Sequence, residues 1–272
     1  MSSFNLTSPL FWVGSKRWQV PYIRALWHGH ESRRYVEPFC GGLSMALGLE
    51  PNVALINDAN PYLINFYRWL QHGWEYHESD HLPNTPEMYY TIRDAFNARL
   101  SHETLDDAKR FYALNRLGHK GLFRLNSKGK LNTSYGHRRV RAFDNVGTPN
   151  YTAYRHVIGT WAFTSGSYAS IELRPDDFLY LDPPYDTEFT QYLAGGFTWN
   201  DQVAVAEWAA AHTGPVVLCN QATPRITQLY QDLGFDLSFA TRVERMRSSN
   251  MSSAREVIAT RSWWTPSQPT LC

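Results

Sequence analysis

The chain has 272 residues and a formal net charge of +1 at pH 7, so a polyanion could be held only through a locally basic face. Its length suits one large domain or one domain with an insert, and its three cysteines lack the CxxC or Cys/His spacing of a zinc site. It has no leader pattern and no run of ~20 apolar residues, so we expect a cytoplasmic protein with neither a metal nor a membrane partner.

Short apolar runs predict seven strands along the chain, and helical patterns separate several of them. One helix is expected from Asn60, an N-cap-like residue followed by a proline in NPYLINFYRWLQ, and another from Asn200 in NDQVAVAEWAAAH. Strands that alternate with helices predict an α/β fold with a largely parallel sheet. The expected strands are residues 35–38, 54–57, 161–164, 178–181, 216–220, 237–243 and 256–260.

Two motifs lie before the helix that is predicted from Asn60. The loop FWVGSKRW brings an aromatic, Trp12, close to a cation, Lys16, although this composition also suits an ordinary surface loop. The run YVEPFCGGLSMAL then gives a strand, a tight glycine turn and a helix pattern, in which glycine lets the backbone approach a ligand. A glycine turn after a strand can also simply turn the chain.

An acid follows the second predicted strand. In LINDAN, Asp58 stands where a carboxylate can accept hydrogen bonds from the ribose hydroxyls of a nucleotide-like cofactor. The glycine turn and this acid, taken together at this spacing, favour a cofactor site more strongly than either does alone.

Between about residues 74 and 153 the strand-helix alternation is interrupted. The segment is helix-prone at first (TPEMYYTIRDAFNARL) and then becomes rich in glycine, asparagine and basic residues. Ten lysines and arginines and one acid lie between Lys109 and Asp144. A solvated loop can have this composition, but interleaved glycines and aromatics are typical of nucleic-acid-binding segments.

The stretch FLYLDPPYDTEF ends an apolar run with Asp182, two prolines and Tyr185. Neither proline can donate to a strand ladder and each fixes its own φ, so the strand must end here. Aspartate and proline are common turn residues. In open α/β sheets, however, ligands bind at the carboxyl ends of strands. The tetrapeptide alone leaves a turn and an active site both open.

The order of FWVGSK, YVEPFCGGLS, LINDAN, NRLGHKGLFRLNSKGKLNTSYGHRR and LYLDPPY resembles the Dam-type (D12 class) DNA adenine-N6 methyltransferases, especially phage-like members. The resemblance runs from about residue 9 to 260. It implies S-adenosylmethionine as methyl donor, a Rossmann-like methyltransferase sheet, and an inserted helical target-recognition domain carrying a β-hairpin. We therefore expect a catalytic domain of residues 1–73 and 154–272 and a target-recognition insert of residues 74–153.

The resemblance also implies which residues bind the cofactor. Trp12 and Lys16 would line its methionine end, with the Lys16 ammonium on the carboxylate. The glycine turn around it would include Phe39, Gly41 and Ser44.

Four further residues complete this expected cofactor site. Asp58 would hold the ribose, and Asp182 would lie beside the methyl group. Ser167 and Tyr168, in FTSGSYAS, would lie beside the cofactor adenine, although Tyr168 also suits a core aromatic.

The chemistry gives the tetrapeptide a role. An exocyclic adenine amine is a poor nucleophile because its lone pair is delocalised into the ring. Hydrogen-bond acceptors on both amine hydrogens direct that lone pair at the sulfonium methyl, and the Asp182 carboxylate and the Pro183 carbonyl can supply them. Pro183 and Pro184 would stiffen the loop. Tyr185 would stack on the adenine, which must be flipped out of the duplex at a cost on the order of a few kcal/mol.

In the family the hairpin reads bases and wedges into the duplex. Arg124 matches a base-reading arginine, whose guanidinium fork can pair with guanine O6 and N7. Lys128 and Lys130 are expected at phosphates. The other DNA-binding residues implied by the resemblance are His119, Lys120, Leu122, Asn126, Arg138 and Arg139.

The chain departs from many GATC-specific relatives in this region. Relatives carry an aromatic and an asparagine where this chain has His119 and Lys120, and a basic residue where it has His137. Phe11 stands where a lysine that touches DNA can occur. These departures leave the recognition sequence open.

We therefore expect a site-specific DNA adenine-N6 methyltransferase that acts on double-stranded DNA, at GATC or a related short site, as a monomer or a weak dimer. Its setting would be a bacterial cell or a phage-infected host. One alternative is a methyltransferase for cytosine N4 or another planar nitrogen, although those enzymes more often carry Ser or Asn where this chain has Asp182. Another is a non-catalytic DNA-binding protein of the same fold, which would tolerate loss of Asp182, Asp58 or Lys16.

Overall fold

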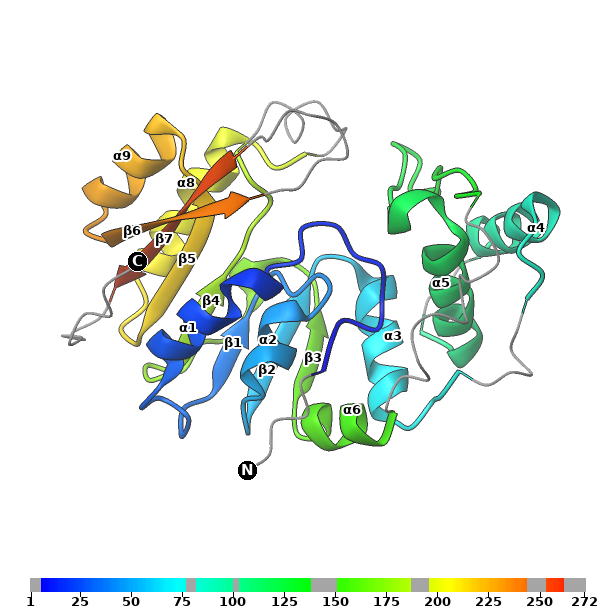
Figure 1. Ribbon diagram of the computed structural model, residues 1–272, viewed down its shortest axis with the longest axis horizontal. Coiled ribbons are helices and arrows are strands. Elements are labelled where there is room, and N and C mark those ends of the chain that lie inside the picture. Colours follow the sequence, from blue (N-terminus) through cyan, green and yellow to red (C-terminus); the bar gives the residue numbers. More distant parts are fainter. Residues whose placement is uncertain are drawn as a thin grey trace. The chain divides into compact units, whose positions relative to one another are not determined.

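The computed structural model describes residues 6–76, 82–99, 103–137, 151–186, 196–243 and 253–261. Within these ranges, seven strands form a mixed sheet in the order β3-β2-β1-β4-β5-β7-β6, with helices between them along the chain (Figure 1). The predicted α/β class is therefore confirmed. The chain divides into a first unit, Met1–Ser32 with Cys40–Tyr168, and a second unit, Arg33–Phe39 with Ala169–Cys272.

In the first unit, β2 (Ala54–Asp58) pairs in parallel with β3 (Ala162–Ser165), so that Asp58 lies opposite Ser165 at the carboxyl ends of both strands. The same unit contains α1 (Val20–Trp27), α2 (Ser44–Leu49), α3 (Pro61–Gln71) and α6 (Tyr151–Ile158), together with the 3-10 helices η1 (Arg17–Gln19) and η3 (His119–Gly121). A third 3-10 helix, η4 (Tyr168–Ser170), begins at the last residue of this unit.

Helix α3 begins where the sequence predicts. The Asn60 side chain accepts hydrogen bonds from the backbone N–H groups of Tyr62 and Leu63, and Pro61 needs no donor at the first helical position. Apolar residues at helical spacing bury one face, with Leu63 and Phe66 almost fully covered. The helix leads directly away from the Asp58 end of β2, which fixes the loop between them.

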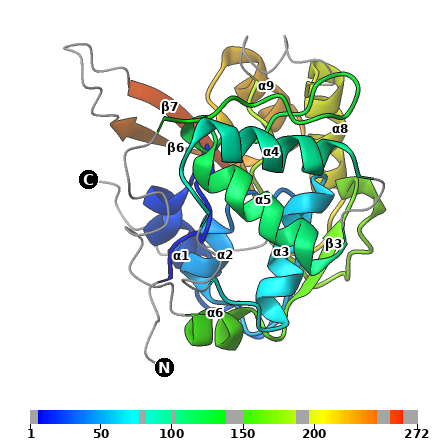
Figure 2. The same cartoon turned by 90° about the vertical axis from the view of Figure 1, so that its right-hand side faces the viewer.

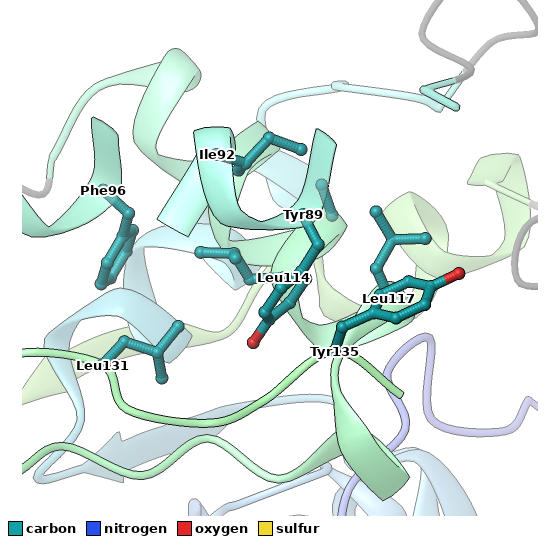
Figure 3. Close-up of a cluster of buried hydrophobic side chains, with 8 residues drawn as sticks. Tyr89, Ile92, Phe96, Leu114, Leu117, Leu131 and Tyr135 are labelled. Atoms are coloured by element: carbon teal, nitrogen blue, oxygen red, sulfur yellow. The ribbon is translucent and has the colours of Figure 1, made fainter. Parts of the chain in front are cut away.

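Two further helices lie in the segment, residues 74–153, that interrupts the alternation of strands and helices. Helices α4 (Pro86–Asn97) and α5 (Leu105–Leu117) pack on each other, and α5 also packs on α3 (Figure 2). Their shared apolar cluster includes two residues from the chain after α5, Leu131 and Tyr135 (Figure 3). The remaining buried members are Tyr89, Ile92, Phe96, Ala113, Leu114 and Leu117.

The chain after α5 folds back on itself as a hairpin, residues 118–136. Isolated antiparallel bridges join Gly118 to Tyr135 and Leu125 to Leu131, without regular strands between them. The backbone N–H of Asn126 donates to the Lys130 carbonyl at 2.8 Å, which closes the turn. The expected hairpin is thus present as a loosely paired loop anchored on α4 and α5.

In the second unit, β1 (Tyr35–Glu37), β4 (Phe178–Leu181) and β5 (Val216–Gln221) run parallel. The antiparallel strand β7 (Ser253–Arg261) lies between β5 and β6 (Asp236–Val243) and pairs with both. Helix α8 (Trp199–Ala210) packs on β5, and α9 (Pro224–Asp232) on β6. Chain order reverses between β1 and β4, and such a reversal is where ligands bind in open α/β sheets.

Helix α8 corrects one expected boundary. The sequence predicts its start at Asn200, but the helix begins at Trp199 and Thr198 is its N-cap. Thr198 and Asp201 form a capping box, in which each side chain accepts from the other residue's backbone N–H. This reciprocal pair outcompetes Asn200 as a cap because it satisfies two backbone donors.

Candidate active site

The tetrapeptide from Asp182 to Tyr185 directly follows β4, at the reversal between β1 and β4. All four residues of β4 are buried, and the strand ends at Leu181, before the two prolines that cannot donate to a ladder. Asp182 and Tyr185 are half-buried, Pro183 is buried and Pro184 is exposed. The strand therefore delivers a carboxylate and an aromatic ring to the edge of a buried sheet.

The hydroxyl of Tyr185 is held by β7. It donates a hydrogen bond to Glu256 Oε2 at 2.8 Å, and Glu256 is itself buried. Burial, followed by the carboxylate of Asp182 and then by other nearby groups that include Glu256, raises the pKa of Tyr185 well above its ordinary value. Tyr185 therefore remains a neutral phenol, which suits a ring that stacks on a base.

The residue after the tetrapeptide is anchored by an ion pair. The Asp186 carboxylate accepts from Arg225 Nε at 2.5 Å and from the Thr223 hydroxyl at 3.3 Å. Thr223 is also the N-cap of α9. The start of α9 thus fixes the chain just beyond Tyr185.

In the first unit, the glycine turn lies against Trp12. A Cβ atom on Gly41 would come within 2.9 Å of Trp12 Nε1, and one on Gly42 within 2.9 Å of Trp12 Cβ. Gly41 also has φ +43°, in the left-handed region. A side chain at either position would force the indole away, so the sequence GG is required by this contact.

Asp58 holds the same turn. Its Oδ2 accepts from the backbone N–H of Gly41 at 3.0 Å, and its Oδ1 from that of Asn60 at 2.9 Å. Burial raises the pKa of Asp58 above its ordinary value, against the lowering effect of these two hydrogen bonds. On the other side of the turn, the Tyr67 hydroxyl donates to the Gly41 carbonyl at 2.8 Å. Tyr67 was not expected from the sequence, because nothing in a helical apolar pattern marks it as a turn-binding residue.

The first unit contains two other expected cofactor residues, Ser44 and Lys16. Ser44, the first residue of α2, shares a 2.8 Å hydrogen bond with the Ser15 hydroxyl. Lys16 is buried and precedes η1. Phe39 belongs to the second unit, where its ring meets the edge of the Phe197 ring at a centroid distance of 6.1 Å.

Ser167 and Tyr168 follow the carboxyl end of β3. The turn before them is tied to β2, since Gly166 N–H donates to the Asp58 carbonyl at 3.1 Å and Asn57 Nδ2 donates to the Gly166 carbonyl at 3.0 Å. Ser167 is exposed and Tyr168 is half-buried, so Tyr168 is no core aromatic. Within the first unit, Asp58 is thus bonded to both the glycine turn and the turn that precedes Ser167.

The hairpin displays most of its expected DNA-binding residues to solvent. Arg124 is exposed, and its Nε donates to Asn132 Oδ1 at 3.1 Å, which orients the guanidinium. The exposed residues of this set are His119, Lys120, Leu122, Arg124, Asn126, Lys128 and Lys130, whereas Arg138 and Arg139 lie outside the described residues.

Asn126 has a local role that the sequence did not indicate. Its Oδ1 accepts from the backbone N–H groups of Lys128 at 2.9 Å and Lys130 at 3.1 Å. An asparagine that bonds the backbone a few residues on is typical of tight turns. Asn126 therefore sets the turn that presents the two lysines.

Phe11 contacts two residues of α5. Its ring lies under the buried Arg116 guanidinium, 3.9 Å from ring centroid to Cζ. Asn115 binds its backbone twice, accepting from Phe11 N–H at 2.9 Å and donating to the Phe11 carbonyl at 2.8 Å. Phe11 therefore joins the amino-terminal loop to α5.

The described residues contain neither a group of three or more His, Cys, Asp or Glu side chains that could hold a metal ion nor a helix long and apolar enough to cross a membrane.

The chain is similar to known methyltransferases over most of its length. A family model for the D12 class of N6 adenine-specific DNA methyltransferases matches residues 12–248. A DNA adenine methylase of Vibrio cholerae is 31% identical, covering 92% of this chain and 94% of that protein. A type II methyltransferase of Lactococcus lactis subsp. cremoris is 29% identical, covering 95% of this chain and 96% of the relative. A DNA N-6-adenine-methyltransferase of Escherichia phage P1 is 31% identical over 84% of this chain and 32% of the phage protein. The chain therefore belongs to the D12 class of N6 adenine-specific DNA methyltransferases.

Proposed function

We propose that this enzyme methylates the N6 amine of an adenine flipped out of duplex DNA, within GATC or a related short site. The observation that carries the proposal is the placement of Asp182 directly after buried β4, at the reversal of strand order, with the neutral Tyr185 ring three residues further on. A half-buried carboxylate beside a fixed aromatic suits a base whose amine needs an acceptor and whose face needs a stacking partner.

The acceptors carry the chemistry. The Asp182 carboxylate and the Pro183 carbonyl accept the two hydrogens of the target amine, which directs its lone pair and stabilises the positive charge that develops on nitrogen. S-adenosylmethionine, the methyl donor of this enzyme, supplies an electrophilic methyl group when bound. Tyr185 stacks on the extrahelical adenine. Pro183 and Pro184 restrict the backbone, so the acceptors need little reorganisation when the base arrives.

The residues of the first unit fit a cofactor that carries a nucleoside and an amino acid. Gly41 lets the glycine turn pack closely against Trp12, and Asp58 retains further acceptor capacity beyond its two backbone bonds. Asp58 would hold the ribose, and Trp12 and Lys16 the methionine end. Gly41 and Ser44 would surround that end, with Ser167 and Tyr168 beside the adenine. Phe39, which the resemblance also assigns to the cofactor site, belongs to the second unit.

The exposed hairpin would bind DNA. Arg124 would read a guanine edge, and Lys128 and Lys130 would meet phosphates. Leu122 is 42% exposed, which is unusual for a large apolar side chain and suits a wedge between bases. His119, Lys120, Arg138 and Arg139 would add contacts, while Asn126 shapes the turn. Residues 74–153 would form the target-recognition insert, on an enzyme that acts as a monomer or a weak dimer.

Sequencing that detects modified bases tests this proposal. The DNA would come from a host that lacks other methylases and expresses the chain, with an Asp182→Ala strain as control. We expect N6-methyladenine at one short motif, absent from the control. Methylated cytosine would instead support the N4-cytosine alternative, and unmodified DNA from a protein that binds DNA would support the non-catalytic one.

A further inference from the structure

Two buried amide side chains hold the backbone on both sides of Tyr185. Gln202, in the first turn of α8, donates from Nε2 to the Pro184 carbonyl at 2.7 Å. Asn220, near the carboxyl end of β5, accepts at Oδ1 from the backbone N–H of Asp186 at 3.2 Å. Both amides are almost fully buried, at 1% and 0% exposure. The peptide groups immediately before and after Tyr185 are therefore both fixed from the protein interior.

The two amides also fix each other. Asn220 Nδ2 donates to Gln202 Oε1 at 2.9 Å and to the Tyr230 hydroxyl at 3.2 Å. Its Oδ1 further accepts from the backbone N–H of Gln221 at 2.8 Å. A buried polar group that loses its partner costs about 1–3 kcal/mol, so rotating either amide would leave donors facing donors at that cost. The orientation of the pair is thereby set.

A third buried residue holds the far end of the Tyr185 side chain. Glu256 accepts the hydroxyl hydrogen, and it lies opposite Gln221 in the β5–β7 ladder. Asn220 and Glu256 therefore occupy neighbouring positions on two paired strands. Glu256 accepts from the Tyr185 hydroxyl, and Asn220 accepts from the backbone N–H of Asp186. The capping box of α8 fixes the helix turn that presents Gln202.

We infer that Gln202, Asn220 and Glu256 are positioning residues, which set the direction of the Tyr185 ring before DNA binds. This inference rests on the proposed function, in which that ring stacks on the target adenine. A ring held at both flanking peptide groups and at its hydroxyl has little rotamer freedom left to lose when the base arrives. Because misplacement of a reacting group by ~1 Å can cost ~100-fold in rate, the network acts on the chemical step and not on cofactor binding.

The test compares Gln202→Met, which keeps the side-chain length but cannot donate to Pro184, with Glu256→Met, which removes the acceptor for the hydroxyl. Three quantities are measured: the single-turnover rate of methyl transfer to duplex DNA, the affinity for S-adenosylhomocysteine, and the fluorescence of DNA with 2-aminopurine at the target position. We expect each variant to slow transfer by ~10–100-fold, with affinity for the homocysteine product changed by less than about threefold. Fluorescence should rise, because a flipped base that is not stacked on the ring is less quenched.

A coupling measurement separates positioning from general damage. If Glu256 acts through the Tyr185 hydroxyl, Glu256→Met should have no further effect in a Tyr185→Phe background. Glu256→Gln retains an oxygen acceptor and should restore the rate to near that of the wild type. Equal, additive effects in the two backgrounds would overturn the assignment of Glu256, and this pair carries the test if Gln202→Met does not fold.

Gln71→Met is the matched control. Gln71 donates to the carbonyls of Ile158 at 2.6 Å and Trp161 at 2.8 Å, so this variant also removes a side-chain amide from two backbone contacts, but in the first unit. It should lower the melting temperature without the split between rate and affinity. If Gln202→Met behaves like this control, the network is merely structural.

The outcomes also separate this inference from the proposed function. No adenine methylation by the wild type would reject the function itself, and an unaffected Tyr185→Ala variant would reject the stacking role. A wild type that transfers methyl, together with a slow Tyr185→Ala and an unaffected Gln202→Met, would reject the inference and leave the proposed function in place.

Discussion

Asp182 directly follows β4, whose ladder ends before the two prolines. Its half-buried carboxylate therefore lies just outside the strand and next to a buried sheet. In the proposed mechanism, Asp182→Ala removes one of the two acceptors for the target amine. We expect a loss of ~100-fold or more in methyl transfer, with cofactor binding weakened only in part, because other residues hold the cofactor. Tritium transfer from labelled cofactor to DNA measures it. Retention of more than about a tenth of the wild-type rate would rule out this role.

Asp58 binds the backbone of the glycine turn, and we propose that it also binds the ribose of the cofactor. One experiment can separate these two roles. Asp58→Ala should weaken binding of S-adenosylhomocysteine by roughly 1.5–3 kcal/mol, the usual value of a hydrogen bond to a charged group, without changing which DNA sequence is modified. Calorimetry of the product and of its analogue without ribose hydroxyls measures it. The wild type should discriminate between the two ligands, and the variant should not.

The control for this change is Tyr67→Phe, which releases the other side of the glycine turn while leaving the Asp58 carboxylate in place. If both variants lose affinity equally and both still discriminate between the two ligands, Asp58 acts only by shaping the turn.

The protonation of Asp58 should also affect how the free energy of unfolding changes with pH. Its folded pKa is raised above the ordinary value of 3.8, so the folded state binds this proton more tightly than the unfolded chain does. The resulting stabilisation is fully present below pH ~3.8 and is lost as pH rises through the folded pKa. Asp58→Asn cannot titrate. The wild-type free energy of unfolding minus that of Asp58→Asn should therefore fall with rising pH across this window, measured by urea unfolding without cofactor. A difference that rises with pH would contradict the cause given for the shift.

At the scale of elements, α4 anchors the base of the hairpin, and the tip of the hairpin is exposed to solvent. Tyr89 donates its hydroxyl hydrogen to the Thr133 carbonyl at 2.8 Å, and Asn97 binds the Leu131 backbone through both amide atoms, at 2.8 and 3.0 Å. These contacts come from α4, while the tip from Arg124 to Lys130 is exposed. A firm base and an exposed tip suit an element that must enter a groove without unfolding.

Arg124→Ala tests base reading by this element. It should relax discrimination at one position of the site by ~1–3 kcal/mol, the usual value of a bidentate base contact. Methylation rates on oligonucleotides with every single-base change would measure it, with Arg110→Ala on α5 as a basic control outside the hairpin. If Arg124→Ala lowers every rate by the same factor, the arginine contacts a phosphate and reads no base.

The elements differed in how well the sequence predicted them. Helix α3 follows from its Asn60 cap and apolar spacing, and all seven strands lie within a few residues of their expected positions. The hairpin was expected from the resemblance, but its irregular pairing was not. Its register is set by tertiary anchors such as Asn97 and Tyr135, which local periodicity does not reveal.

At the scale of the whole molecule, a net charge of +1 leaves no general attraction for DNA. We therefore expect DNA binding to depend on the local charge of the hairpin. Lys128→Ala should weaken all DNA sequences alike and lower the slope of log affinity against log salt by about one. Titrations at several salt concentrations measure it, and Lys130→Ala should behave in the same way. A changed preference between sites with an unchanged slope would show that Lys128 reads bases.

The sequence by itself determined the α/β class, the positions of the strands, and the residue types of the expected site. Each of these depends on local signals: period, caps, prolines, and the order of short motifs along the chain. Asp58 and Asp182 could be singled out because each directly follows an apolar run that must be a strand.

Only the tertiary structure decided what holds those residues in place. The Tyr185 hydroxyl donates a hydrogen bond to Glu256, 71 residues away, and the Pro184 carbonyl accepts one from Gln202, 18 residues away. Glu256 reaches the site because β7 pairs with β5, and Asn220 because β5 lies beside β4. Strand order selects these partners, and it results from the packing of the whole sheet, which no local pattern of apolar and polar residues encodes.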